Sequence, residues 1–193
     1  MKTVKCNSTN ELIIKNSRFI TLLMAINDET DINLILEDVK TQYPKATHYC
    51  YAYISKSFKR CSDDGEPGGT AGMPMLNVLE KEKMINTLAI VIRYFGGIKL
   101  GAGGLVRAYS KSVREAIINS NVLPVQLGYL VRVTIPYNET KSFDYLIKDY
   151  RVIGTEYLDN VTYNILLPVD KVNILTNYSY QIIKEEYIEK ELS

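Results

Sequence analysis

The stretch RYFGGIKLGAGGLVRAYSKSV, residues 93–113, decides how the first part of this chain is built. Five glycines fall within its nine residues 96–104. Residues 86–95 are rich in β-branched and apolar side chains, which predicts a strand. Apolar residues recur at helical spacing over residues 102–119, which predicts a helix. The glycines therefore join a strand to a helix, and they serve either to hold an anion or to allow close packing.

The predicted strand and helix differ in how many faces they bury. The strand is apolar on both faces through its centre, so we expect it to lie in the middle of its sheet. The helix is expected to bury a stripe formed by Leu105, Ala108, Ser112, Val113, Ala116 and Ile117. Arg107, Lys111 and Arg114 lie nearly opposite that stripe on a helical projection. The sequence thus predicts a basic outer face on this helix.

The glycine-rich segment does not match either of two known phosphate-binding motifs. The P-loop requires a lysine where Ala102 stands, and the dinucleotide fingerprint requires a third glycine where Val106 stands. We therefore expect no cofactor and no metal. A helix start with unpaired N–H groups still suits a nucleic-acid phosphate, and tight packing without a ligand is the alternative. The candidate anion-binding residues are Arg93, Gly96, Gly97, Lys99, Gly101, Gly103, Gly104, Arg107, Lys111 and Arg114.

A second loop, SDDGEPGGTAG at residues 62–72, is acidic and rich in turn residues. Its carboxylates suit a Mg²⁺ site or a general acid and base, although EF-hand spacing is absent. Alternatively they accept hydrogen bonds from local N–H groups or pair with Arg60, Arg93 or Lys99. The loop residues singled out are Asp63, Asp64, Gly65, Glu66, Gly69, Thr70 and Gly72.

His48 is the only histidine and lies two residues from Cys50. Residues 47–55 alternate in polarity and predict a strand, so both side chains face the same side. A Cys–His catalytic pair is one interpretation, and a packed strand face is the other. The candidate catalytic residues are Asp64, Glu66 and His48.

The remaining pattern predicts two domains, residues 1–125 and 126–193. The first adds a strand over 17–26, a helix over 27–43 capped by Asn27 or Asp28, a polar loop over 56–72 and a helix over 73–84. Pro124 and Gly128 suggest a break over 121–128. Beyond it, the predicted elements follow the order βαββαβ, which is typical of a ferredoxin-like domain.

Composition limits the classes of function. The chain has 193 residues and a net charge of +1. A net charge this small does not produce a general electrostatic attraction to nucleic acid or to a membrane. Residues 1–125 carry a charge of +4 and the remainder −3, which suggests different partners for the two parts. Three cysteines without a paired pattern, and a start without an apolar signal region, favour a reduced cytoplasmic setting.

The acidic loop followed by LAIVIRYFGGIKLGAGGLVRAY resembles the IMPACT/YigZ family, with His48 and Cys50 ahead of both motifs. The resemblance covers the whole chain. It implies an α+β protein whose first domain is a two-layer α/β fold of the ribosomal protein S-five domain-two type. It also implies a second domain resembling elongation factor G domain V. Two positions depart from the family pattern: Gly68 occupies a position where Ser or Ala is common, and Tyr49 occupies one where a second His is common. These departures argue against a mechanism that needs a serine hydroxyl or a pair of histidines.

Three functions follow as expectations. The first is a cytoplasmic binding protein that contacts RNA or the ribosome through its first domain and regulates translation, which the resemblance implies. The second is a metal-dependent hydrolase or phosphoryl-transfer enzyme with a site between the acidic and glycine-rich loops. The third is a scaffold that binds a protein through its second domain. We favour binding over catalysis, because no nucleophile-plus-base constellation is visible.

Overall fold

The computed structural model describes residues 1–26 and 31–190. The chain divides into two compact units, Met1–Pro124 and Val125–Ser193. Each unit combines helices with antiparallel strands, which confirms the two-domain α+β organisation expected from the sequence. Within the described ranges, the helices are all too short or too polar to cross a membrane.

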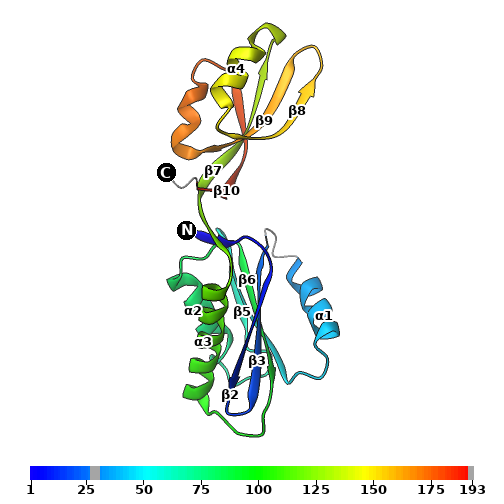
Figure 1. Cartoon of the computed structure of the whole chain (residues 1–193), viewed down its shortest axis with the longest axis vertical. Helices are drawn as coiled ribbons and strands as arrows, with labels where there is room; N and C mark the ends of the chain where they lie inside the picture. The colour runs from blue at the N-terminus through cyan, green and yellow to red at the C-terminus, as the bar shows by residue number, and fades with distance from the viewer. Residues whose placement is uncertain (27–30, 191–193) are drawn as a thin grey trace. The chain divides into compact units, whose positions relative to one another are not determined.

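The first unit is built on an antiparallel sheet of five strands in the order β2-β3-β6-β4-β5 (Figure 1). These strands are β2 (Ser8–Ile14), β3 (Ser17–Ala25), β6 (Thr87–Tyr94), β4 (His48–Ile54) and β5 (Lys59–Ser62). Strand β6 lies in the middle and is buried on both faces, as its apolar sequence predicts. A short strand β1 (Lys2–Val4) pairs with residues 122–124 at the start of β7 (Val122–Ile135).

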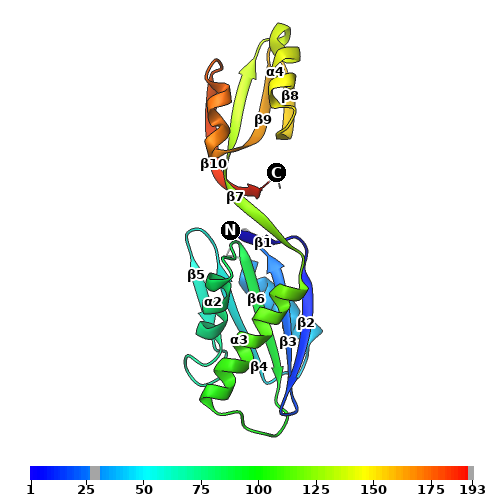
Figure 2. The same ribbon diagram turned by 60° about the vertical axis from the view of Figure 1, so that its left-hand side comes forward.

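Helices cover both faces of this sheet. Helix α1 (Ile32–Gln42) packs on one face, where its Ile32 and Val39 join a cluster with Ile90 and Ile92 of β6. Helices α2 (Gly72–Lys81) and α3 (Ala102–Asn119) pack side by side on the other face (Figure 2). The expected two-layer arrangement is therefore wrong. The central strands are apolar on both faces, so both faces require cover, and α1 supplies a third layer.

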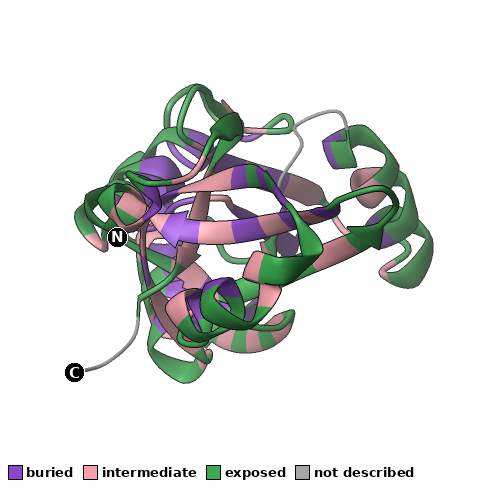
Figure 3. Ribbon diagram, turned by 90° about the horizontal axis from the view of Figure 1, so that it is seen from above, coloured by how far each residue is buried: buried purple, intermediate pink, exposed green. Residues whose placement is uncertain are grey.

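Several boundaries differ from the sequence prediction. The helix expected over 27–43 is described from Ile32, and the proposed caps Asn27 and Asp28 lie outside the described residues. Strands β1, β2 and β5 were not predicted, because β1 is very short and the other two are largely exposed and polar. Helix α3 has the predicted bounds, and its predicted stripe is buried. Figure 3 shows buried and exposed residues alternating along the helices.

The second unit contains a sheet in the order β10-β7-β9-β8, with every neighbouring pair antiparallel. Its elements after β7 are η2 (Tyr137–Glu139), α4 (Thr140–Ile147), β8 (Arg151–Tyr157), β9 (Val161–Pro168), η3 (Val169–Leu175) and β10 (Tyr180–Glu189). The α-helix expected after β9 is instead the 3₁₀ helix η3. Its β-branched and asparagine residues are weak α-helix formers.

The break expected over residues 121–128 lies inside strand β7. Gly128 is not a turn residue here. A Cβ at this position would lie 2.7 Å from both the Leu167 carbonyl oxygen and Ile188 Cδ1. The glycine is therefore needed for close packing between strands.

Candidate functional site: a buried carboxylate between two loops

The acidic loop is tied to the elements on either side of the glycine segment by one carboxylate, that of Glu66. The guanidinium of Arg93, on β6 before the glycines, donates from Nη1 to Glu66 Oε1 at 2.5 Å. The hydroxyl of Tyr109, on α3 after the glycines, donates to the same oxygen at 2.7 Å. The Glu66 and Arg93 side chains are only 3% and 6% exposed. Glu66 thus holds the acidic loop against both elements that the glycine segment connects.

The arginine of this pair is fixed on several sides. Its Nη2 donates to the Ser17 hydroxyl at 3.4 Å, and its guanidinium lies over the rings of Phe19 and Phe95, 5.4 and 5.5 Å from their centroids. Removing two opposite charges from water is costly, and their attraction offsets that cost only when the geometry and remaining hydrogen bonds are good. Arg93 is therefore committed to the interior and cannot serve as a surface phosphate ligand. That part of the sequence prediction is wrong.

Asp63 closes the acidic loop on itself. Its carboxylate accepts hydrogen bonds from the backbone N–H groups of Gly69, Ala71 and Gly72 at 2.8, 2.9 and 2.8 Å, where α2 begins. The Ala71 and Gly72 N–H groups are among those that a helix start leaves without partners. Burial alone would raise the pKa of Asp63, but the three N–H donors outweigh it and hold the pKa below its usual value. Its stabilising effect is present above the ordinary Asp pKa and is lost as pH falls through the lowered value.

Strand β4 presents His48 and Cys50 to the same loop, as their spacing predicts. His48 Nδ1 donates to the Asp64 carbonyl oxygen at 2.8 Å, and its Nε2 lies 3.7 Å from Glu66 Oε2. The Cys50 thiol donates to the Asp63 carbonyl oxygen at 3.0 Å. Each side chain therefore bonds to the acidic loop, and the structure shows a packed strand face in place of a Cys–His pair.

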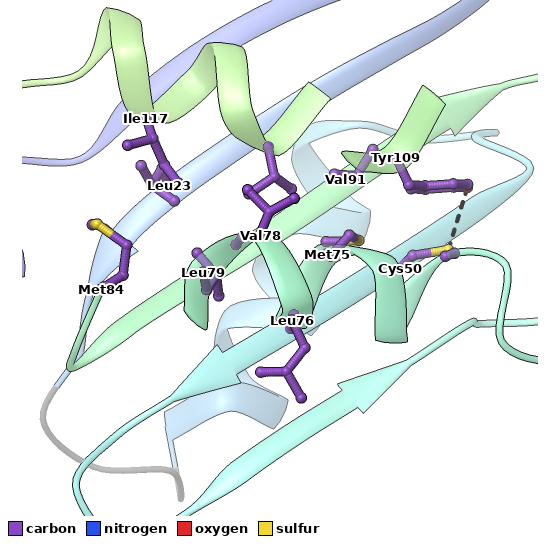
Figure 4. Packing of buried hydrophobic residues seen from close by; sticks show 14 of the residues in the cluster. Leu23, Cys50, Met75, Leu76, Val78, Leu79, Met84, Val91, Tyr109 and Ile117 are labelled. Atoms are coloured by element: carbon purple, nitrogen blue, oxygen red, sulfur yellow. Dashed lines mark hydrogen bonds between the residues drawn. The ribbon is translucent and has the colours of Figure 1, made fainter. Parts of the chain in front are cut away.

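Cys50 is unsuited to nucleophilic chemistry. Burial raises its pKa to about 12; the hydrogen bond with Tyr109 opposes the rise, and nearby carboxylates add to it. The thiolate is the nucleophile, so a thiol that stays protonated at neutral pH is inert. Figure 4 shows Cys50 and Tyr109 joined by their 3.3 Å hydrogen bond within the apolar cluster under α2 and α3.

The acidic loop offers little to a metal ion. Asp63 and Glu66 accept protein donors as described, and Asp64 accepts the Tyr49 backbone N–H at 2.6 Å. Thr70, also in the loop, is buried and donates its hydroxyl to the Pro67 carbonyl oxygen at 2.7 Å. Across residues 1–26 and 31–190, no group of three or more His, Cys, Asp or Glu side chains is arranged to hold a metal.

The glycines of the second loop have different surroundings. Gly96 packs directly on the backbone of Asn16, and its N–H donates to the Ser17 hydroxyl at 3.2 Å, so it is not free for an anion. Gly97 and Gly101 have φ angles of +82° and +70°, which favour glycine. Gly103 and Gly104 lie in the first turn of α3. Close packing thus accounts for Gly96, as the alternative interpretation proposed.

The predicted basic residues outside this cluster do lie at the surface. Arg107, Lys111 and Arg114 are exposed on α3, on the side away from its buried stripe, and Lys99 is exposed in the glycine segment. Lys111 is 3.5 Å from Glu115. We call Arg107, Lys111 and Arg114 the basic face of α3. They and Lys99 are the charged members of the predicted set that remain available to a ligand.

Sequence reasoning did not assign functional roles to Tyr109 and Ser17. Both are fully buried, and both use a hydroxyl to connect the Glu66–Arg93 pair to its surroundings. Tyr109 follows Leu105 by four residues and so belongs to the buried stripe of α3. A hydroxyl on the buried face of a helix needs a hydrogen-bond partner in the interior. This requirement is the feature of the sequence that indicates a role for Tyr109.

The comparisons with known proteins indicate the same family as the acidic and glycine-rich motifs do. The Impact N-terminal domain family matches residues 15–117. The chain is 36% identical to the IMPACT family member YvyE of Bacillus subtilis (strain 168), over 93% of this chain and 85% of that protein. It is 34% identical to the IMPACT family member YigZ of Escherichia coli (strain K12), over 82% and 81% respectively. A crystal structure of a hypothetical protein aligns with a TM-score of 0.66 at 29% identity, covering 95% of this chain and 97% of that chain.

Replacing Glu66 by Gln should destabilise the first unit strongly. The substitution keeps the size of the side chain but leaves the Arg93 charge buried without a counterion, for which about 3–5 kcal/mol is typical. The free energy of unfolding in urea measures the loss. Glu80→Gln is the matched control, because it breaks the exposed Lys59–Glu80 pair at 2.7 Å and should cost about 1 kcal/mol or less. Equal small losses in both variants would show that the buried pair contributes little.

Gly96→Ala should also destabilise the fold, because the added methyl group would overlap the backbone of Asn16. We expect a loss of about 1–3 kcal/mol or more in urea unfolding. Gly68→Ala is the control, since a Cβ at Gly68 meets no atom within 4 Å. Similar stabilities of the two variants would contradict the close-packing role of Gly96.

Proposed function

Since the chain belongs to the IMPACT family, we propose that it binds RNA, on the ribosome or elsewhere in the translation apparatus, and regulates translation from the cytoplasm. The family resemblance implies the connection to translation. The three cysteines Cys6, Cys50 and Cys61 are free, which accords with a reducing compartment. The order β10-β7-β9-β8 supports the ferredoxin-like assignment of the second unit. The sheet with α2 and α3 on one of its faces supports a relation of the first unit to ribosomal protein S-five domain two, with α1 as an added layer on the other face.

The basic face of α3 is the observation that carries the proposal. Arg107 and Arg114 are exposed, and within the described part of the chain neither is engaged by a carboxylate. Among the residues that the structure describes, Lys111 pairs with the partly exposed Glu115, and a surface ion pair of this kind contributes little energy. Exposed cations aligned along a helix suit the regularly spaced phosphates of RNA. The loop carboxylates, in contrast, are occupied by protein donors, which disfavours the hydrolase alternative.

Lys111→Glu/Arg114→Glu should weaken binding to structured RNA and flatten its dependence on salt. Removing one cation that meets a phosphate should reduce the slope of log K against log salt by about one, so the expected reduction for the pair is about two. Filter binding or fluorescence anisotropy at 50 and 200 mM salt gives both quantities.

The matched control for this experiment is Lys141→Glu/Lys148→Glu. It makes the same change of net charge in the second unit, at the exposed Lys141 of α4 and at the exposed Lys148 that caps its C-terminal end. We expect this control to bind as the wild type does. Identical affinities of the wild type and the α3 variant at both salt concentrations would contradict RNA binding through α3.

A protein partner for the second unit remains a second candidate function. Strand β8 lies at the end of its sheet and exposes Val152, Ile153 and Tyr157. Exposed apolar edge strands are typical of surfaces that pair with another chain. A wild-type protein without RNA affinity at 50 mM salt would leave this scaffold function as the better candidate.

A further inference from the structure

Three turns of the first unit are held together where β6 ends. The β2–β3 turn meets the glycine segment, since the Gly96 N–H donates to the Ser17 hydroxyl at 3.2 Å. The turn between α1 and β4 meets the end of β6 through two contacts. The Phe95 N–H donates to the Thr47 hydroxyl at 3.0 Å, and the Tyr94 hydroxyl donates to the Pro44 carbonyl oxygen at 3.3 Å. These bonds fix the surroundings of one aromatic side chain, Phe95.

Phe95 is exposed although it directly follows the most buried strand of the sheet. Its exposed fraction is 46%, and that of Ile98 in the neighbouring glycine segment is the same. The guanidinium of Arg93 lies 5.5 Å from its ring centroid, and Glu66 fixes that guanidinium in turn. The ring is therefore held in place by buried groups while nearly half of the residue faces solvent.

Each of the three turns also carries an exposed lysine. Lys15 is on the β2–β3 turn, Lys45 is on the turn before β4, and Lys99 is in the glycine segment. Within the described residues, no carboxylate lies at ion-pairing distance from any of the three. Arg18 is different, because Glu11 holds it at 2.8 Å. An oriented aromatic ring thus lies among turns that bear unpaired positive charge.

We propose that Phe95 is a stacking platform for an unpaired RNA base, with Lys15, Lys45 and Lys99 meeting the adjoining phosphates. The inference rests on the proposed function and names the class of RNA: single strands and hairpin loops, in preference to duplex. Bases stack on aromatic rings only when they are free of their own stack, and phosphate contacts then follow the backbone on either side. A duplex offers phosphates to the basic face of α3 but no free base to Phe95.

The chain contains no tryptophan, so Phe95→Trp places a single tryptophan at the platform, which can be excited selectively over the tyrosines. Titration with a single-stranded oligonucleotide should quench its emission, and a blunt duplex of equal length should quench it much less. Tyr145→Trp is the matched control, because it places the single tryptophan at an exposed position of the second unit. Equal quenching of both fluorophores would overturn the proposal.

Phe95→Leu separates stacking from apolar packing, because leucine keeps apolar bulk without an aromatic face. We expect its affinity for a hairpin with a loop to fall about 5- to 150-fold, the range of one stacked base, and its affinity for duplex to stay unchanged. Thermal unfolding of the variant checks that the fold is retained. Phe95→Tyr should restore loop binding.

The two proposals fail in different ways. If Phe95→Leu binds loop RNA as tightly as wild type while the α3 charge reversal still weakens binding, the stacking platform is wrong and RNA binding stands. If neither hairpin nor duplex binds the wild type at 50 mM salt, the proposal that the protein binds RNA is wrong, and so is the proposal that a base stacks on Phe95.

Discussion

The ion pair between Glu66 and Arg93 is the interaction on which the first unit depends. A carboxylate and a guanidinium that have both left water must satisfy each other, and their surroundings must supply the remaining hydrogen bonds. Tyr109 on α3 supplies one to Glu66 and Ser17 on β3 supplies one to Arg93, while the buried Nε of Arg93 has no hydrogen-bond partner within the described residues. The pair therefore constrains four segments at once: the acidic loop, the central strand, the long helix and the edge hairpin. The glycine segment has to make its turn within these limits, which is why Gly96 lies against the backbone of Asn16.

Because of this constraint, the two motifs contain two kinds of polar group: those whose charges are satisfied inside the protein, and those that remain exposed at its surface. Asp63, Glu66 and Arg93 look like catalytic or phosphate-binding groups in the sequence, yet their charges are satisfied inside the protein. What remains at the surface is positive charge on Lys99 and α3, and one oriented aromatic ring. The proposed role in binding accords with this division, because catalysis by these three groups would require reactive atoms that are free of protein partners.

Periodicity predicted the elements that bury apolar side chains in a regular pattern. The strand through residues 86–95 and the helix over 102–119 were found at their predicted places, since the apolar pattern of each is strong. Strand β5 is not evident in the sequence because its residues are polar and partly exposed. The pattern in η3 also predicts an α-helix, because apolar residues three positions apart, such as Val172 and Leu175, lie on one side of either helix type. The third layer formed by α1 was also missed, although the apolar faces of β6 implied it.

The candidate site was harder to predict than the fold. Spacing alone placed His48 and Cys50 on one face of a strand, and it included Arg93 among the possible partners of the acidic loop. It could not choose between Arg60, Arg93 and Lys99, because that choice depends on contacts between residues 27 positions apart. Nor could it show that Arg93 is buried and Lys99 exposed. The basic face of α3 was predicted correctly because helical geometry is local.

A double-mutant cycle on Glu66 and Arg93 tests the central claim most directly. Glu66→Gln, Arg93→Met and the double variant would be compared with wild type by urea unfolding. If the two side chains stabilise the fold as a pair, the double variant loses less than the sum of the single losses, with a coupling of at least about 1 kcal/mol. Losses that add within about 0.5 kcal/mol would contradict the account, because they would show that the two charges act independently.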